Sequence, residues 1–266
     1  MDRLQIACDD FLADLKRIEH LIDLVQVMRR FGASEIPEIL ENNEWEAAET
    51  LWHRAKERRT DLPLISGSLL MYLAGRFEFY VRQLVEVTAE EMARKVDTYL
   101  DLPEKYRNNL KKQVLEIAQN PSRYGFDNVV AEGHLKDFAA LLNSKYDPNH
   151  VSSALLSLTE ANLKSRVLSD VTKRLGMKDV WKDVGKQASL KLALDTATDG
   201  ETTGEAMSKL DTLMDDRNAL AHPTGGMTFP DPEKVIETAK FIEALSQSLR
   251  DLFLVYLAQW EPEVTG

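Results

Sequence analysis

The sequence predicts an all-α protein, and three observations support this class. Apolar residues recur at three- and four-residue steps through most of the chain, which is the period of an amphipathic helix. Glycine and proline are scarce, at 12 and 9 among 266 residues, and no segment alternates apolar and polar residues as a strand would. A hydrophobic content of 44% in a chain of this length is enough for a full buried core.

The N-terminal part of the chain contains two expected helices. The first covers residues 3–30 and carries one continuous apolar stripe. The second covers residues 44–59 and ends in a basic run, after which residues 60–63 have the composition of a boundary. We therefore predict an N-terminal helical hairpin in residues 1–60, which would offer a surface to a partner or to a second protomer.

The rest of the chain, residues 61–266, is predicted to form a helical bundle. Residues 64–99 have the pattern of one long helix, and residues 103–142 that of a helix with interruptions. Asp231 and Pro232, a capping residue followed by a first-turn proline, begin the last helix.

Two polar stretches lie in the middle of this bundle segment. Basic residues outnumber acidic ones over residues 164–191, which is typical either of a solvated face or of a contact with an RNA backbone. Residues 195–204 are rich in threonine, glycine and acidic side chains, and this composition predicts a loop.

Net charge and cysteine content limit the class of protein. A formal charge of −11 argues against a protein that coats nucleic acid, although a local basic groove remains possible. The single cysteine, Cys8, fits a reducing compartment. The chain starts without the apolar segment of a signal peptide, and its longest apolar run, residues 252–258, is too short to span a bilayer. We expect a cytoplasmic protein with no membrane contact.

Neither a metal nor a cofactor is expected from the motifs. The His-Glu-x-x-His, Cys-x-x-Cys and EF-hand spacings are missing. Gly176 and Gly185 superficially resemble a phosphate loop, but they are too far apart, and Gln187 stands where such a loop needs serine or threonine.

The most informative stretch contains Arg217, Asn218 and His222 at the end of a helix that begins near Thr203. Because a residue before proline is pushed toward extended geometry, Pro223 should end the helix and place His222 at its terminus. Asn218 and His222 would share a helix face, whereas Arg217 would meet His222 only if the helix breaks first. The negative end of the helix dipole would favour the imidazolium form.

These residue types suit RNA cleavage without a metal, which needs a base, an acid and a cation for the phosphate charge. Histidine can be base or acid, and arginine binds phosphate through two donors. One chain offers a single histidine at this place, so a symmetric dimer would have to supply the second. The alternative is structural: His222 caps the helix, and Arg217 forms a surface ion pair.

Glu78 and Arg82 form a second candidate pair on the long helix of residues 64–99. They are four residues apart with the acid first, which is the favourable order for a helical ion pair. A plain surface pair contributes only tenths of a kcal/mol. The pair gains functional interest only if its face abuts the helix that carries Arg217 and His222.

Together these residues resemble the HEPN superfamily, whose ribonuclease members carry Arg-x4–6-His with a polar residue after the arginine. Many members also have Glu-x3-Lys on an earlier long helix, where this chain has Glu78 and Arg82; the arginine keeps the charge and leaves a structural pairing open. Residues 68–78, residues 162–181 and the Arg-Asn-x3-His stretch look most like the RiboL-PSP branch. A neighbouring branch, the MAE_28990 type, also stays open.

The resemblance covers about residues 62–260 and implies a bundle of about four to five helices. The expected N-terminal hairpin, residues 1–60, has no counterpart in it. It implies a homodimeric, metal-independent endoribonuclease with a composite site of Arg217, Asn218 and His222, supported by Glu78 and Arg82, that leaves a 2′,3′-cyclic phosphate. The settings it implies are antiviral (phage) defence, a toxin–antitoxin pair or RNA processing, with an antitoxin or defence protein as a possible partner. The alternative is a non-catalytic HEPN-type module that binds RNA, a nucleotide or a partner protein.

Overall fold

The computed structural model describes residues 2–35, 46–57, 61–143, 145–159, 161–222 and 228–262. Every regular element in these ranges is helical, which confirms the predicted all-α class. The four longest are α1 (Arg3–Ala33), α3 (Leu62–Arg94), α10 (Asp199–Ala221) and α11 (Pro232–Gln259). None of the described helices is apolar over a length that could cross a membrane.

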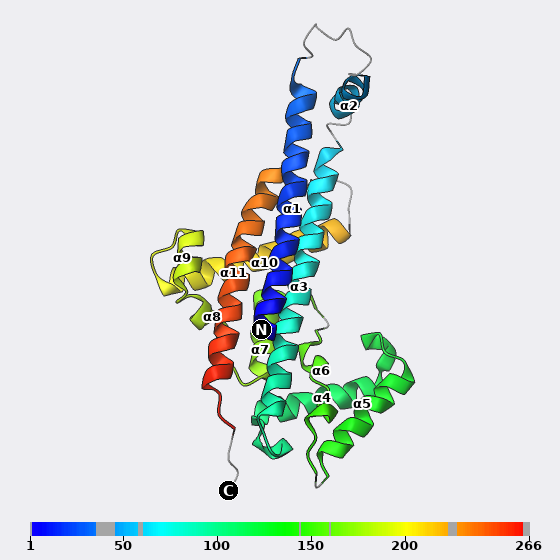
Figure 1. Cartoon of the computed structure of the whole chain (residues 1–266), viewed down its shortest axis with the longest axis vertical. Helices are drawn as coiled ribbons and strands as arrows, with labels where there is room; N and C mark the ends of the chain where they lie inside the picture. Colours follow the sequence, from blue (N-terminus) through cyan, green and yellow to red (C-terminus); the bar gives the residue numbers. More distant parts are fainter. Residues whose placement is uncertain are drawn as a thin grey trace.

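Helices α1, α3 and α11 run side by side along the long axis of the molecule (Figure 1). Their facing sides form the main core, in which the rings of Phe11 and Tyr80 stack with centroids 4.9 Å apart. The Tyr80 hydroxyl donates a 2.7 Å hydrogen bond to the carbonyl oxygen of Ser246, so the only polar atom of this side chain is satisfied inside the core.

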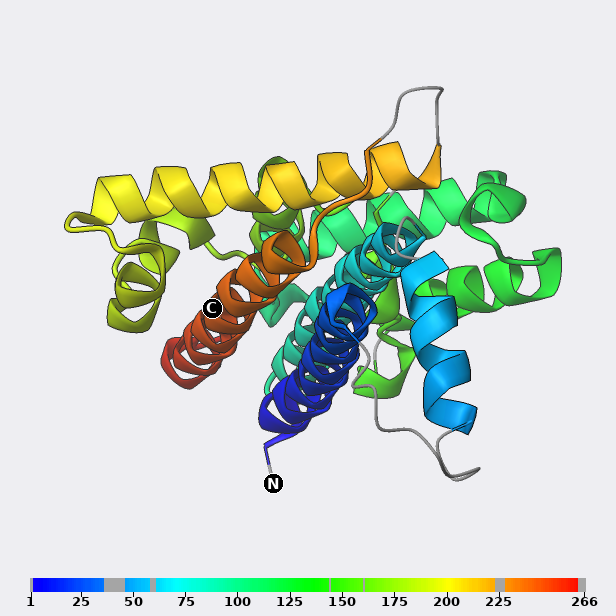
Figure 2. The ribbon, with the colours of Figure 1, turned by 90° about the horizontal axis from the view of Figure 1, so that it is seen from above.

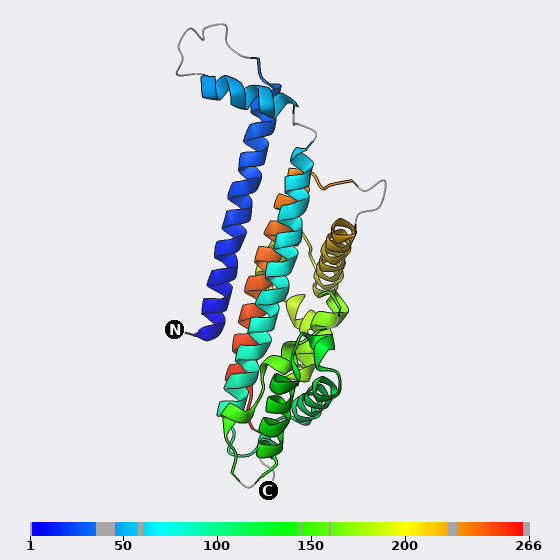
Figure 3. The same ribbon diagram turned by 90° about the vertical axis from the view of Figure 1, so that its right-hand side faces the viewer.

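Helix α10 crosses the bundle on the side of α3 that faces away from α1 (Figures 2 and 3). It starts at Asp199, earlier than the sequence predicts, because Thr198 and Glu201 form a reciprocal capping box. Residues 199–204, predicted as a loop from composition, are therefore helical. Local side-chain capping outweighs the low helix propensity of threonine and glycine here.

Shorter helices fill the remaining sides of the molecule. Helices α4 (Glu104–Gln119) and α5 (Asn128–Leu141) pack on each other at one end (Figure 1). The others are α2 (Glu46–Glu57), α6 (Ala154–Ser157), α7 (Ser165–Arg174), α8 (Val180–Val184) and α9 (Ala188–Leu194), with short 3-10 turns at Tyr99–Asp101, Pro121–Tyr124 and Pro148–His150.

Two sequence predictions about this region need correction. Helix α3 ends at Arg94, and Tyr99 belongs to a separate 3-10 turn instead of the same helix. Arg174, predicted as part of a solvated or RNA-contacting basic face, is half-buried and donates to the carbonyl oxygens of Leu156 and Leu158, at 2.9 and 2.7 Å. This arginine closes the C-terminal end of α6, so it is not a surface charge.

The N-terminal helix contributes to the common core. Apolar residues of α1 are buried against α3 and α11, and α2 packs against α1 at the far end. Gly32 permits that contact, since a Cβ there would lie 2.8 Å from the carbonyl carbon of Ala55. The boundary at residue 60, and the use of residues 1–60 as a surface for a partner or a second protomer, stay predictions.

Candidate functional site

The candidate site lies at the C-terminal end of α10. Arg217 and Asn218 are half-buried in its last turns, and His222 is its C-terminal cap with an exposed side chain. The His222 backbone has left the helical region, at φ −126° and ψ 69°, while its N–H still donates to the Asn218 carbonyl oxygen at 3.1 Å. The predicted helix end at His222 is confirmed; Pro223, Gly225 and Gly226 lie outside the described residues.

Arg217 and Asn218 share a hydrogen-bond network with Asn162, a residue 55 positions before the arginine in the chain. One guanidinium nitrogen of Arg217, Nη1, donates to Asn162 Oδ1 at 2.9 Å and to Asn218 Oδ1 at 3.3 Å. Asn162 Nδ2 also donates to Asn218 Oδ1. The three side chains thus fix one another at the helix end.

The segment that carries Asn162 runs along α10, and we name residues 162–165 the strap. Lys164 Nζ lies 2.5 Å from Asp215 Oδ1. The Ser165 N–H and hydroxyl both donate to the Asp211 carboxylate, at 2.6 and 2.9 Å. Because residues spaced by three or four positions share a helix face, the strap is bonded to one side of α10 along its length.

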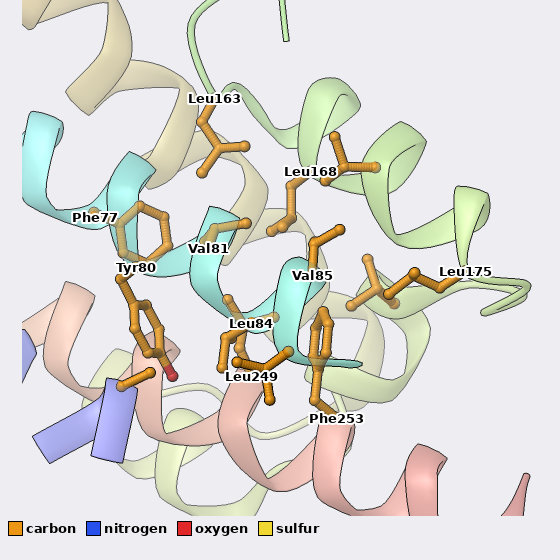
Figure 4. Packing of buried hydrophobic residues seen from close by; sticks show 14 of the residues in the cluster. Phe77, Tyr80, Val81, Leu84, Val85, Leu163, Leu168, Leu175, Leu249 and Phe253 are labelled. Atoms are coloured by element: carbon orange, nitrogen blue, oxygen red, sulfur yellow. The ribbon is translucent and has the colours of Figure 1, made fainter. Parts of the chain in front are cut away.

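The strap is also bonded to α3. The Leu163 N–H donates to Glu78 Oε1 at 3.0 Å. Its side chain is only 4% exposed and faces Val81 of α3 (Figure 4). Further along the chain, Leu168 and Leu175 continue this apolar contact beside Val85 (Figure 4). Glu78 and the network of Arg217 are therefore connected through two neighbouring residues of the strap.

The predicted ion pair between Glu78 and Arg82 is not found among the described contacts. Glu78 accepts the strap N–H instead, and Arg82 is exposed one turn further along α3. Arg82 lies close enough to Glu86 to act on its carboxyl: burial raises the pKa of Glu86, and the hydrogen bond from Ser157 and the charge of Arg82 oppose that rise. The contact with the strap replaces a surface ion pair that would contribute only tenths of a kcal/mol.

The charge of Arg217 is not neutralised by a carboxylate in the part of the chain that the structure describes. Its acidic neighbours are engaged elsewhere, Asp215 with Lys164 and Asp216 with Lys234, each at 2.5 Å. The hydrogen bonds that the structure gives Arg217 with other described residues go to amide oxygens, and they use Nη1 alone. Since a guanidinium has five N–H donors, most of them remain for an anion. Among the described residues, Arg217 therefore forms no surface ion pair of the kind considered as an alternative.

Of the predicted residues, the structure brings Arg217, Asn218 and the helix end at His222 together and connects Glu78 to them through the strap. It does not join Arg82 to this network, and no hydrogen bond between Arg217 and His222 is found in the described ranges. No group of three or more described His, Cys, Asp or Glu residues is arranged to hold a metal. Sequence reasoning missed Asn162 as a member of the site.

A helical bundle that ends one helix in Arg-Asn-x3-His is typical of HEPN-type domains. The chain matches the RiboL-PSP-HEPN family model over residues 41–254, which is most of its length. The protein therefore belongs to the RiboL-PSP-HEPN family, as the resemblance predicted. No curated protein and no solved structure matches the chain. Because HEPN domains are commonly ribonucleases, membership indicates a nuclease or RNA-related role.

Proposed function

We propose that the protein is a homodimeric, metal-independent endoribonuclease in which Arg217, Asn218 and His222 of two protomers form one active site. The observation that carries the proposal is the state of Arg217: it is held by neutral amides, lacks a carboxylate partner within the described ranges and stands five residues before an exposed histidine. A positioned cation beside a proton-transfer group is what phosphodiester cleavage needs.

The proposed reaction is an internal transfer. One His222 takes the proton from the ribose 2′-hydroxyl, and the 2′-oxygen attacks the adjacent phosphorus. The bond from phosphorus to the 5′-oxygen breaks, and His222 of the second protomer, as the imidazolium, protonates that oxygen. The products are a 2′,3′-cyclic phosphate and a 5′-hydroxyl, while Arg217 stabilises the charge on the non-bridging oxygens.

The second histidine is assigned to a second protomer because the chain's other histidines lie elsewhere. His134, on α5, is hydrogen-bonded to Ser152 at 2.8 Å, and His150 is hydrogen-bonded to Asp137 of α5 at 3.0 Å. His20 is on α1, on the side of the bundle away from α10, and His53 is on α2 (Figure 3). Phage defence, a toxin–antitoxin pair or RNA processing are the settings we propose for this activity.

The test is cleavage of total RNA by the purified protein in EDTA. We expect cyclic-phosphate products from the wild type and none from His222→Ala. The matched control is His20→Ala, which removes another exposed helical histidine and should cleave like the wild type. Circular dichroism and light scattering should give unchanged helicity and a dimer for all three proteins. Activity that disappears in EDTA yet survives His222→Ala would contradict the proposal.

A second candidate is a non-catalytic module that binds RNA, a nucleotide or a partner protein. What favours it is that two sizeable hollows among the described residues are lined without Arg217, Asn218 or His222. One of about 620 Å³ is lined by residues of α1, α3 and α11 such as Arg3, Glu91 and Leu257, and one of about 390 Å³ includes Arg29 and Lys56. Tight binding of RNA in a mobility-shift assay without any cleavage product would decide for this function.

A further inference from the structure

We propose that Asn162 is the positioning residue of Arg217, and that Glu78 acts on the site through the strap as a hydrogen-bond acceptor rather than as an acid or base. This inference rests on the proposed function for its catalytic consequence. Its geometric part, which side chain holds Arg217, can be tested in the absence of any cleavage.

A half-buried arginine has several freely rotating bonds, and holding it in one rotamer costs conformational entropy. Asn162 Oδ1 accepts from Nη1 at 2.9 Å, the shorter of the two contacts that the structure gives this guanidinium. Asn218 is the next residue on the same helix, so among the described residues Asn162 is the one that holds Arg217 from outside α10.

The Asn162 oxygen that accepts from Arg217 belongs to an uncharged side chain. An amide oxygen orients the guanidinium without neutralising it, whereas a carboxylate at the same place would form an ion pair and compete with a phosphate. Asn162 also donates through Nδ2 to Asn218, which a carboxylate could not do. The structure thus favours a neutral residue that can both accept and donate at position 162.

Asn162 is held in place by the rest of the strap. The three residues that follow it are bonded to α3 and α10: Leu163 to Glu78, Lys164 to Asp215, and Ser165 to Asp211. The Leu163 N–H needs only an acceptor oxygen, which glutamine would supply as well as glutamate. Glu78 therefore contributes an oxygen at a defined place, two contacts away from Arg217.

The variants that test this are Asn162→Ala, Asn162→Asp, Glu78→Gln and Glu78→Ala. The matched control is Asn108→Ala, which removes an exposed asparagine whose side-chain bond in the described structure lies within α4, to Glu104 at 3.3 Å. Two measurements are made on each full-length protein. One is the NMR signal of the Arg217 guanidinium N–H groups in ¹⁵N-arginine-labelled protein, assigned with Arg217→Lys; the other is kcat and KM for RNA in EDTA.

For Asn162→Ala, we expect the Arg217 signal to lose its dispersion and exchange rapidly with solvent, and kcat to fall about 100-fold. Asn162→Asp should keep Arg217 ordered through an ion pair. Its kcat should nevertheless be as low as that of the alanine variant, because the new carboxylate neutralises the charge of Arg217. Glu78→Gln should match the wild type in both measurements. Glu78→Ala should loosen Arg217 and lower kcat, and Asn108→Ala should change neither.

The following outcomes overturn the inference or separate it from the proposed function. An unchanged Arg217 signal in Asn162→Ala shows that Asn162 does not position the arginine. Loss of cleavage in Glu78→Gln with an ordered Arg217 assigns Glu78 to proton transfer. If Asn162→Ala loses helicity, Asn162→Asp, of nearly the same size, takes its place. A kcat well below that of the wild type then supports the inference, and a wild-type kcat overturns it. A wild type that cuts no RNA, with Arg217 released in Asn162→Ala, refutes the nuclease function and leaves the positioning intact.

Discussion

At the scale of single residues, Arg217 shows how its surroundings determine what a charged side chain can do. Two aspartates precede it on α10, and both have lysine partners from other segments. The guanidinium therefore meets amide oxygens in the described part of the chain and keeps its full charge. A carboxylate in the same position would have made Arg217 a structural ion pair of small energetic value.

Glu86 is a second residue whose surroundings make a measurable prediction. Burial raises its pKa above the ordinary 4.5, so the folded protein holds this proton more tightly than the unfolded chain. Its ionisation therefore destabilises the fold as the pH rises through and above 4.5. Glu86→Gln, which can still accept from Ser157, should raise the free energy of unfolding near neutrality and change little below that pKa.

Urea unfolding of the wild type and Glu86→Gln at acid and neutral pH checks this. Glu57→Gln, on the exposed end of α2, is the matched control and should leave the pH dependence unaltered. If Glu86→Gln raised the free energy of unfolding most at acid pH, the predicted direction of the pH dependence would be wrong.

At the scale of elements, the start of α10 depends on a close contact with α8. Gly185 caps α8, and a Cβ there would lie 2.1 Å from Thr203 Oγ1 and 2.5 Å from the Asp199 carbonyl oxygen. Thr203 Oγ1 in turn donates to the Trp181 carbonyl oxygen at 3.1 Å, which also accepts the Gly185 N–H at 2.9 Å. The lack of a side chain at Gly185 thus determines how closely the first turn of α10 can approach α8.

Gly185→Ala should therefore separate these helices and lower the free energy of unfolding by about 1–3 kcal/mol. Gly204→Ala is the matched substitution inside α10, where a Cβ would meet nothing within 4 Å. It should stabilise the protein by about 0.5–1 kcal/mol, since alanine favours a helix interior more than glycine does. Urea denaturation measures both, and equal effects of the two substitutions would contradict the contact.

At the scale of the whole molecule, α1 is held on α3 by apolar packing and by one buried carboxylate. Asp14 is 4% exposed and lies 2.5 Å from Arg76 Nε and 2.8 Å from Arg17 Nη1, while the Tyr72 hydroxyl donates to it at 3.3 Å. Two of these partners come from α3, so the carboxylate specifies how α1 and α3 are aligned. The family match begins at residue 41, after α1.

Asp14→Ala should cost about 1.5–3 kcal/mol, because it removes the charged acceptor of Tyr72 and Arg76 at the α1–α3 interface while Arg76 stays partly exposed to water. Chemical denaturation gives the loss, and Asp10→Ala, an exposed carboxylate on the same helix, should cost at most a few tenths of a kcal/mol. A loss below about 1 kcal/mol for Asp14→Ala would mean that apolar packing alone aligns the two helices.

The sequence by itself determined what depends on neighbours along the chain: the all-α class, most of the long helices, the start of α11 at Asp231 and Pro232, and the helix end at His222. Periodicity, caps and proline act within a turn or two, so these features can be predicted without knowing the rest of the fold. The same information correctly indicated the RiboL-PSP-HEPN family.

Only the tertiary structure decided which side chains meet Arg217. Asn162 lies 55 residues before it, and no spacing rule connects them. Glu78 bonds the Leu163 N–H, 85 residues away, instead of the arginine one turn along its own helix. Both contacts exist because the strap is packed between α3 and α10. Such placement follows from how buried surfaces fit together, which a local pattern does not encode.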